Sequence, residues 1–237
     1  MKIDINSHYA ELEAYGIDSG IINDGHNAEA VSSLFNSAKP ARFAPQQHIY
    51  QEGLVADTIY HIKKGMVKLV SYLPNGKARI VRLLGQGKLL GLDGIVNQNY
   101  EHTAIAVNQV ELLKIPTYML NRIKSQDPEK FFLVGEQWYD YLRAADTWIT
   151  QFSTGSIRAR VARLVTFLSY IESETDHNQV ELLNVEEMAA VLGVTPESVS
   201  RVLADFKRRH ALERMSDSDG YHYTRNCELL QEFAQDH

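Results

Sequence analysis

Three hydrogen-bonding side chains stand close together near the start of an amphipathic stretch, residues 196–207. Glu197, Ser200 and Arg201 fall on the side of this stretch that its apolar residues leave free. Arginine can donate two hydrogen bonds to one guanine, serine donates or accepts, and glutamate accepts from cytosine. The residue types and their spacing therefore predict contacts with the edges of nucleic-acid bases.

Two short helices and a turn are expected to position these side chains. Residues 185–192 form a first amphipathic helix, Gly193 suits a left-handed turn, and Thr195 can cap the second helix. The apolar residues expected to hold the two helices together are Met188, Ala189, Leu192, Val194, Val199, Val202 and Leu203. This pattern predicts a helix-turn-helix whose second helix enters the major groove of DNA, although two packed helices with a polar face have the same spacing.

Charge is distributed unevenly along the chain. The whole chain has a net charge of -6, which is unusual for a nucleic-acid-binding protein. Between Thr195 and Arg214, however, five basic residues outnumber three acidic ones, and local charge governs contact with phosphates. The residues expected to contact the DNA backbone are Thr195, Ser198, Lys207, Arg208 and Arg209, although a solvated helix end would carry the same charges.

The segments on either side complete the predicted architecture. After Leu212 the pattern is strand, turn and strand, with Asp219 and Gly220 as the hairpin turn, so 155–237 is expected to be a winged helix-turn-helix domain. Residues 28–126 are expected to be a β-roll sensor domain, preceded by an N-terminal extension, 1–27. Its strand-like runs are 48–50, 58–62, 66–72, 78–84, 103–107 and 110–115, with a hairpin turn at Asn75 and Gly76.

Residues 127–154 are expected to form a long dimerisation helix. Apolar or small residues recur there at alternating spacings of four and three, which is typical of a seam between two helices. The residues of this seam are Phe131, Gly135, Trp138, Leu142, Ala145, Ile149 and Phe152. The same spacing also fits a helix that packs on its own domain, but the small Gly135 and Ala145 favour close approach of a second helix and therefore a homodimer.

The order of these elements resembles the Crp/Fnr family of bacterial transcription regulators over about residues 30–235. The similar segments are IYHIKKGMV at 59–67, PNGK at 74–77, LLGQGKLLG at 83–91 and, most specifically, LGVTPESVSRVL at 192–203. The resemblance implies an α+β fold. An antiparallel β-roll, a jelly roll like those that bind cyclic nucleotides, is followed by the dimerisation helix and the C-terminal winged helix-turn-helix.

The resemblance also implies a function. A Crp/Fnr-like protein binds double-stranded DNA as a homodimer at an inverted repeat, and contacts RNA polymerase if it is an activator. In the Fnr-like branch, Glu197, Ser200 and Arg201 correspond to residues that read a half-site of the TTGAT type, with Arg201 on the guanine. One departure is Ala211, where the family usually has glycine at the end of the recognition helix.

The segment that holds cyclic nucleotides in the family differs here. Leu92, after the cassette glycine Gly91, replaces the glutamate that binds the ribose, and Tyr100 with Glu101 replaces the Arg-Ser pair that binds the phosphate. No arginine occurs between Arg82 and Arg122, so a buried phosphate would lack its cation. Neither cyclic AMP nor cyclic GMP is therefore expected. The candidates for an effector pocket are Gly91, Leu92, Tyr100, Glu101, His102, Thr103 and Trp138.

No cofactor is predicted. Cys227 is the only cysteine, which excludes a cysteine-bound iron–sulfur cluster. Haem stays open as an alternative, with His8, His26, His48, His61 and His102 as the candidate axial ligands. Because the sequence has neither a cluster of metal ligands nor a nucleophile motif, we expect no enzymatic activity.

The compartment and two alternative functions complete the sequence-based expectations. The chain has no apolar run long enough to cross a membrane and no secretory signal, so a cytoplasmic protein without a membrane partner is expected. In the first alternative, an effector-responsive β-roll is joined to a winged helix that contacts a protein instead of DNA. In the second, the regulator needs no small ligand and is controlled by its own abundance.

Overall fold

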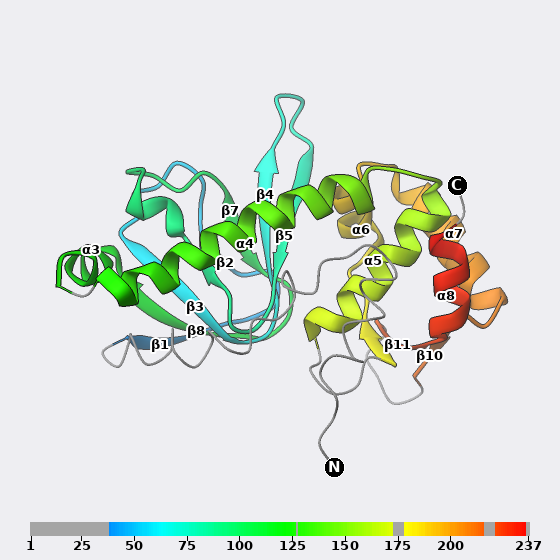
Figure 1. Ribbon diagram of the computed structural model, residues 1–237. Coiled ribbons are helices and arrows are strands. Elements are labelled where there is room, and N and C mark those ends of the chain that lie inside the picture. Colours follow the sequence, from blue (N-terminus) through cyan, green and yellow to red (C-terminus); the bar gives the residue numbers. More distant parts are fainter. Residues whose placement is uncertain (1–37, 127, 173–177, 216–220, 236–237) are drawn as a thin grey trace, which may run out of the picture. The chain divides into compact units, whose positions relative to one another are not determined.

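The computed structural model of the protein describes residues 38–126, 128–172, 178–215 and 221–235 (Figure 1). The predicted N-terminal extension, 1–27, lies outside these residues. The described chain divides into two compact units, and the boundary falls between Arg143 and Ala144. We call them the β-roll unit, up to Arg143, and the winged-helix unit, from Ala144.

Two antiparallel four-stranded sheets form the β-roll unit. In the first sheet the strand order is β1 (Lys39–Phe43), β8 (Val110–Pro116), β3 (Thr58–Lys64) and β6 (Leu89–Leu90). In the second it is β2 (His48–Tyr50), β7 (Thr103–Ala106), β4 (Val67–Tyr72) and β5 (Ala78–Leu84). The predicted antiparallel β-roll is therefore confirmed, and only the short β1 and β6 were absent from the predicted strands.

The hairpin between β4 and β5 illustrates how local sequence sets this fold. Gly76 has the positive φ of 77° that the turn requires, and the side-chain oxygen of Asn75 accepts the N–H of Lys77 at 3.0 Å. Tyr72 pairs with Ala78 at the end of the ladder. Figure 1 shows this hairpin projecting from its sheet. The Asn-Gly signal in the sequence thus marks a real turn.

Helical segments follow the strands of the roll. They are the short 3-10 helix η2 (Leu92–Ile95), then α3 (Thr117–Gln126) and the long α4 (Pro128–Phe152). Thr117 fixes the start of α3, because its hydroxyl donates to the carbonyl of Ala56 at 3.0 Å. The core beneath these helices consists of Ile59, Leu89, Leu92, Ile115 and Leu120.

In the described residues, the winged-helix unit has four further helices and one small sheet. The helices are α5 (Ile157–Glu172), α6 (Val185–Leu192), α7 (Pro196–Arg208) and α8 (Cys227–Ala234). The sheet has the order β10 (Leu212–Arg214), β11 (His222–Arg225) and β9 (Gln179–Glu181). Phe206 of α7 stacks on Phe233 of α8 with ring centroids 5.0 Å apart, which joins the two helices.

The strands of the predicted wing are present in the described chain. β10 and β11 pair antiparallel as a winged helix requires, while the predicted hairpin turn at Asp219 and Gly220 lies outside the described residues. β9 adds a third strand that was not predicted. None of the helices in the described ranges combines the length and the apolarity needed to cross a membrane.

Candidate nucleic-acid interface

Capping residues set the geometry of the turn between α6 and α7. Asn184 begins α6: its side-chain oxygen accepts the N–H of Glu187 at 2.8 Å, and the Glu187 carboxylate accepts the N–H of Asn184 at 3.3 Å. Gly193 ends α6 in the left-handed conformation, φ 67°, and donates its N–H to Ala189 at 2.8 Å. Gly193 therefore forms the left-handed turn expected from the sequence, because glycine adopts this conformation without the steric cost of a Cβ.

The start and the buried side of α7 determine which residues remain outside. Thr195 is in extended backbone and its hydroxyl oxygen accepts the N–H of Ser198 at 3.4 Å, while Pro196 fills the first turn. Val199, Leu203 and Phe206 are buried along one side of α7. Burial of this row leaves the opposite side of the helix to solvent.

Glu197, Ser200 and Arg201 are all exposed, at the N-terminal end of α7. The guanidinium of Arg201 donates through Nε to the carbonyl of Glu197 at 3.3 Å. The pKa of Glu197 lies below its ordinary value, chiefly because its carboxylate accepts its own backbone N–H and interacts with the Thr195 side chain. At neutral pH this corner therefore offers an ionised acceptor next to a cationic donor, and both retain hydrogen-bonding capacity toward a ligand.

The cations at the far end of α7 have protein partners. Lys207 donates through Nζ to the hydroxyl of Tyr223 in β11 at 2.9 Å and lies 4.7 Å from the centroid of that ring. Arg208 and Arg209 both pair with Asp205, the latter at 3.3 Å. Their side chains remain 77% and 48% exposed, so both can still reach a phosphate.

Asp205 is a residue that the sequence-based prediction did not single out. Arg158 of α5 reaches the same carboxylate at 3.3 Å, so three arginines from two helices meet there. Burial raises the pKa of Asp205, but the surrounding guanidinium groups more than offset this and hold it below the ordinary value. The only sequence signal for this role was an acid three and four residues before two arginines on one helix.

The end of α7 bears on the departure noted at Ala211. The left-handed residue there is His210, with φ 59°, one position before Ala211. The N–H of His210 donates to the carbonyl of Lys207 at 3.2 Å, and the N–H of Ala211 donates to the carbonyl of Phe206 at 2.9 Å. These two hydrogen bonds are those of a Schellman motif. The position where glycine is favoured on steric grounds is therefore 210. Ala211 is fully buried in ordinary backbone.

Three residues of the predicted seam on α4 pack against their own chain. Phe131 and Trp138 pack against the core of the β-roll unit. Phe152 is buried in the winged-helix unit, where it contacts Trp148 and Phe167 edge to face. Phe152 is therefore fully used within its own chain, whereas Phe131 and Trp138 are half-buried and keep part of their surface exposed.

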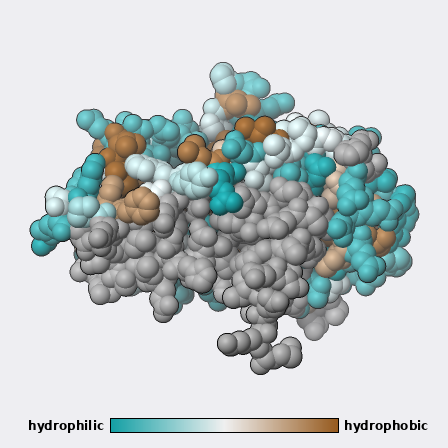
Figure 2. All heavy atoms as spheres, in the orientation of Figure 1, coloured by the Kyte–Doolittle hydropathy of each residue, from teal (hydrophilic) through white to brown (hydrophobic). Residues whose placement is uncertain are grey.

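A different stripe of α4 is exposed. Phe132, Tyr139, Leu142 and Ile149 are 62–68% exposed, and Gly135 has open space around it. From Phe132 to Leu142 these residues are spaced by three and four, and Ile149 follows one heptad later, as in the predicted seam, which shares Gly135, Leu142 and Ile149. In Figure 2, apolar side chains reach the surface along the course that α4 takes in Figure 1. Ala145, the remaining seam candidate, is half-buried.

Tyrosines occupy the interior of the β-roll where effector residues were predicted. Tyr100 stacks on Tyr50 with ring centroids 3.9 Å apart, and Tyr50 stacks on Tyr60 at 5.8 Å. The hydroxyl of Tyr100 donates to the carbonyl of Thr58 at 2.6 Å. All three rings belong to the main core of the roll, and burial raises the pKa of each phenol. Their positions, 50, 60 and 100, are too far apart in sequence for periodicity to group them.

The other effector candidates lie around this tyrosine cluster. Gly91 has φ 77°, and a Cβ there would come within 2.9 Å of the Thr58 carbonyl. Leu92 is buried in the core, and the Thr103 hydroxyl accepts the N–H of Glu52 at 3.1 Å. Two further candidates face outward: Glu101 is exposed and bonded to Asn97, and His102 is half-buried. Arg82 of β5 lies 4.4 Å from the ring centroid of Tyr141 in α4.

The histidines proposed as haem ligands differ in environment. His8 and His26 lie outside the described residues. His48 is exposed and bonded to Gln51, whereas His61 is 1% exposed within β3. Burial and the charge of Lys63 lower the pKa of His61 to about 4. Among the described residues, no three or more potential ligands from His, Cys, Asp and Glu come together as a metal site.

Comparison with known proteins identifies both units. A model of the cyclic nucleotide-binding domain matches residues 40–127, and a model of the Crp-like helix-turn-helix domain matches residues 159–233. The transcriptional regulator LdrP of Thermus thermophilus is 29% identical over 70% of this chain and 84% of that protein. The nitrogen fixation regulation protein FixK of Azorhizobium caulinodans is 23% identical over 74% of this chain and 71% of that protein.

Solved structures agree with this match. The Crp-family regulator TTHB099 of Thermus thermophilus has a TM-score of 0.71 and 26% identity, over 82% of this chain and 96% of that one. A β-roll joined by a long helix to a winged helix-turn-helix defines a class of bacterial transcription regulators. This chain belongs to the Crp/Fnr family of that class, as the resemblance predicted.

Proposed function

We propose that the protein binds double-stranded DNA as a homodimer, with α7 of each subunit in the major groove of one half-site of an inverted repeat. The observation that carries the proposal is the exposed corner of Glu197, Ser200 and Arg201 at the N-terminal end of a rigidly capped helix. Recognition helices touch base edges with this part of the helix, and paired half-sites lie about 34 Å apart.

The proposed half-site is of the TTGAT type, with Arg201 on the guanine. Support comes from the resemblance of 192–203 to the Fnr-like branch and from the geometry of bidentate arginine contacts. Thr195, Ser198, Lys207, Arg208 and Arg209 would contact phosphates. For Arg208 and Arg209 this requires exchanging Asp205 for a phosphate, which suits groups as exposed as these.

We further propose that the β-roll does not bind cyclic AMP or cyclic GMP. Leu92 stands at the position of the ribose-binding glutamate and is buried among apolar side chains. Tyr100 stands at the position of the phosphate-binding arginine and is stacked on Tyr50. Arg82, the preceding arginine in the sequence, is engaged by the ring and the carbonyl of Tyr141. At these positions a buried phosphate would therefore lack the arginine that pairs with it in cyclic-nucleotide-binding members of the family.

The proposed role involves no chemistry and no cofactor. A regulator of this kind acts in the bacterial cytoplasm by binding DNA and, if it is an activator, by contacting RNA polymerase. Haem is the alternative that His61 keeps open, because it is a buried imidazole kept neutral at pH 7. The absorbance spectrum of the purified protein tests it, and we expect no Soret band.

DNA binding can be separated from the alternative of a protein partner by a salt titration. Fluorescence anisotropy of a labelled duplex with a TTGAT inverted repeat is measured between about 50 and 200 mM salt, where phosphate contacts lower affinity by orders of magnitude. A scrambled duplex is the control for sequence preference. We expect steep salt dependence and tighter binding to the repeat. Equal, weak binding to both duplexes would support the protein-partner alternative.

A further inference from the structure

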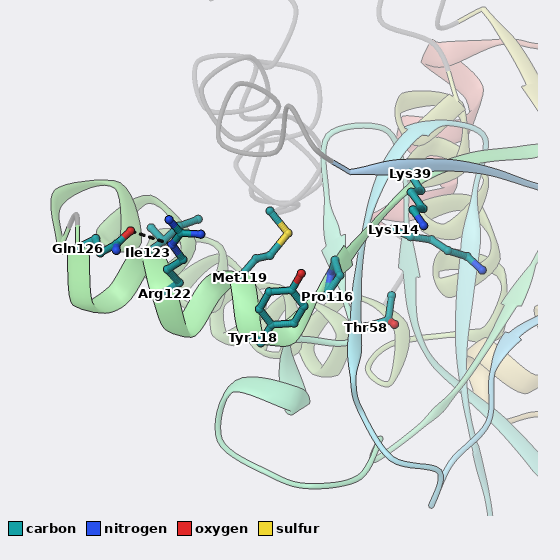
Figure 3. A pocket seen from close by; sticks show the side chains of 9 residues that line it. All are labelled: Lys39, Thr58, Lys114, Pro116, Tyr118, Met119, Arg122, Ile123 and Gln126. Atoms are coloured by element: carbon teal, nitrogen blue, oxygen red, sulfur yellow. Dashed lines mark hydrogen bonds between the residues drawn. The ribbon is translucent and has the colours of Figure 1, made fainter.

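A cleft opens in the β-roll unit between α3 and the ends of β1, β3 and β8, with a volume of about 620 Å³ (Figure 3). We call it the α3 cleft. Its lining residues are Lys39, Thr58, Lys114, Pro116, Tyr118, Met119, Arg122, Ile123 and Gln126. Three of these nine described residues are cationic, and none of the nine is acidic.

Two of the cations stand directly opposite each other. Lys39 of β1 is paired with Lys114 of β8 in the antiparallel ladder, so both side chains lie on the same face of the sheet. Figure 3 shows them side by side at one end of the cleft. Like charges directly opposite each other destabilise a sheet, and an anion between them would offset this.

The same ladder provides an internal comparison. Three residues along, Arg42 is paired with Glu111, and the two form an ion pair at 3.0 Å. One charged pair of this ladder is therefore complementary, whereas the exposed Lys39 and Lys114 at the cleft carry like charges. The Lys114 ammonium lies 5.8 Å from the ring centroid of Phe43, which does not neutralise it.

The remaining walls define what the cleft can hold. Arg122 of α3 supplies the third cation and is oriented by a bond from its Nε to the side chain of Gln126 at 3.0 Å. Tyr118 is 69% exposed, and Met119 is half-buried beside it, so α3 offers an aromatic and an apolar surface. The Thr58 hydroxyl donates to Asp57 at 2.8 Å, but Asp57 does not line the cleft.

We propose that the α3 cleft binds a small molecule that carries phosphate groups. Lys39 and Lys114 hold the phosphate between them, and Arg122, at the opposite end of the cleft, is left for another anionic group of the ligand (Figure 3). Guanidinium and ammonium groups are the side chains that bind phosphate most strongly. The site is separate from the tyrosine-filled interior of the roll, so it stands whether or not the proposed mode of DNA recognition is correct.

Methionine-methyl NMR reports directly on the site. The chain has five methionines, and Met119 lines the cleft, while Met66 and Met188 are buried elsewhere and serve as internal references. The full chain is labelled at its methionine methyl groups and titrated with inorganic pyrophosphate at constant ionic strength. The Met119 signal is assigned with the Met119→Leu variant. We expect it to shift saturably while the two reference signals stay in place.

A charge-neutral variant tests the residues that the proposal names. In the double variant Lys39→Gln, Lys114→Gln we expect affinity for pyrophosphate to fall about tenfold or more, since charged hydrogen bonds are lost. The matched control is Lys77→Gln, which removes an exposed lysine on the β4–β5 hairpin and should bind like the parent. No shift of the Met119 signal in the parent, or equal affinity in the parent and the double variant, would overturn the proposal.

Discussion

At the scale of single residues, left-handed backbone occurs on both sides of α7, once at a glycine and once at a residue with a Cβ. Gly193 and His210 both adopt left-handed backbone, with φ 67° and 59°. Glycine does so without strain, whereas a residue with a Cβ carries a cost of about 1–2 kcal/mol. The strain lies at the entry to the wing, outside the proposed base-reading corner.

The strain at His210 predicts that glycine stabilises the protein. His210→Gly should raise the free energy of unfolding by about 0.5–1 kcal/mol, after the greater flexibility of the unfolded glycine chain is counted. Chemical denaturation measures it. His210→Ala is the matched control, because it removes the exposed contact with Glu213 but keeps the Cβ. Equal stability of the glycine and alanine variants would contradict the assignment of strain.

Buried His61 predicts a pH dependence. Its pKa falls from the ordinary 6.5 to about 4 in the folded protein, so only the unfolded chain gains a proton between these values. Stability is therefore complete above pH 6.5 and is lost as the pH falls toward 4, by up to about 1.4 kcal/mol per pH unit. The measurement is urea unfolding of the parent and of His61→Leu at a series of pH values between about 4 and 7. The free energy of unfolding, plotted against pH, should have a shallower slope for the variant. Parallel slopes would refute this account.

At the scale of elements, α4 shows where sequence patterns reach their limit. Its heptad spacing predicted a seam, but apolar residues occupy two adjacent faces of this helix, and periodicity does not tell which face meets the helix's own domain. Phe131 and Trp138 pack against the β-roll. Phe132 and Tyr139, on the neighbouring face of the helix, are exposed. We therefore propose that Phe132 and Tyr139 contact the second subunit in place of Phe131 and Trp138.

This shift predicts opposite effects for two neighbouring aromatic residues. Tyr139→Glu should weaken the proposed dimer at least about thirtyfold, as expected for an interface aromatic, and leave the fold intact. Trp138→Ala should instead lower the melting temperature of the β-roll, because it removes core contacts. Analytical ultracentrifugation and thermal melting of both variants are the measurements. Dissociation by Trp138→Ala alone would return the seam to its first predicted register.

Other elements were predictable in proportion to their local signals. The bounds of α6 and the starts of α4 and α7 could be derived because capping residues, glycine and proline mark them. β6 and β9 have two and three residues, too few for any alternation to be visible. The tyrosine cluster and the contact of Arg158 with Asp205 combine residues far apart in sequence, so only the fold brings them together.

At the scale of the whole molecule, a regulator of this family needs a difference between two states. An effector can shift such an equilibrium only if it binds one state more tightly. In the β-roll, buried tyrosines occupy the interior, and Arg82 holds Tyr141 of α4. On our proposal, therefore, DNA binding does not depend on a cyclic nucleotide.

Addition of cyclic AMP tests that statement. DNA affinity, measured by anisotropy with and without saturating cyclic AMP, should be unchanged, and the Tyr100→Ala variant should also fail to respond because no arginine is restored. A regulator that is activated by cyclic AMP is the positive control for the assay. A saturable rise in affinity for the parent would contradict the pocket analysis.

Base reading by the α7 corner is tested most directly by selecting bound sites from random DNA with the parent and Arg201→Ala. Arg79→Ala, in the β4–β5 hairpin, is the control for loss of an arginine away from α7. The parent and the control should select one inverted repeat. Arg201→Ala should lose about 1–3 kcal/mol of preference at one base pair per half-site and keep the rest. Selection of the same repeat with undiminished preference by Arg201→Ala would contradict the account.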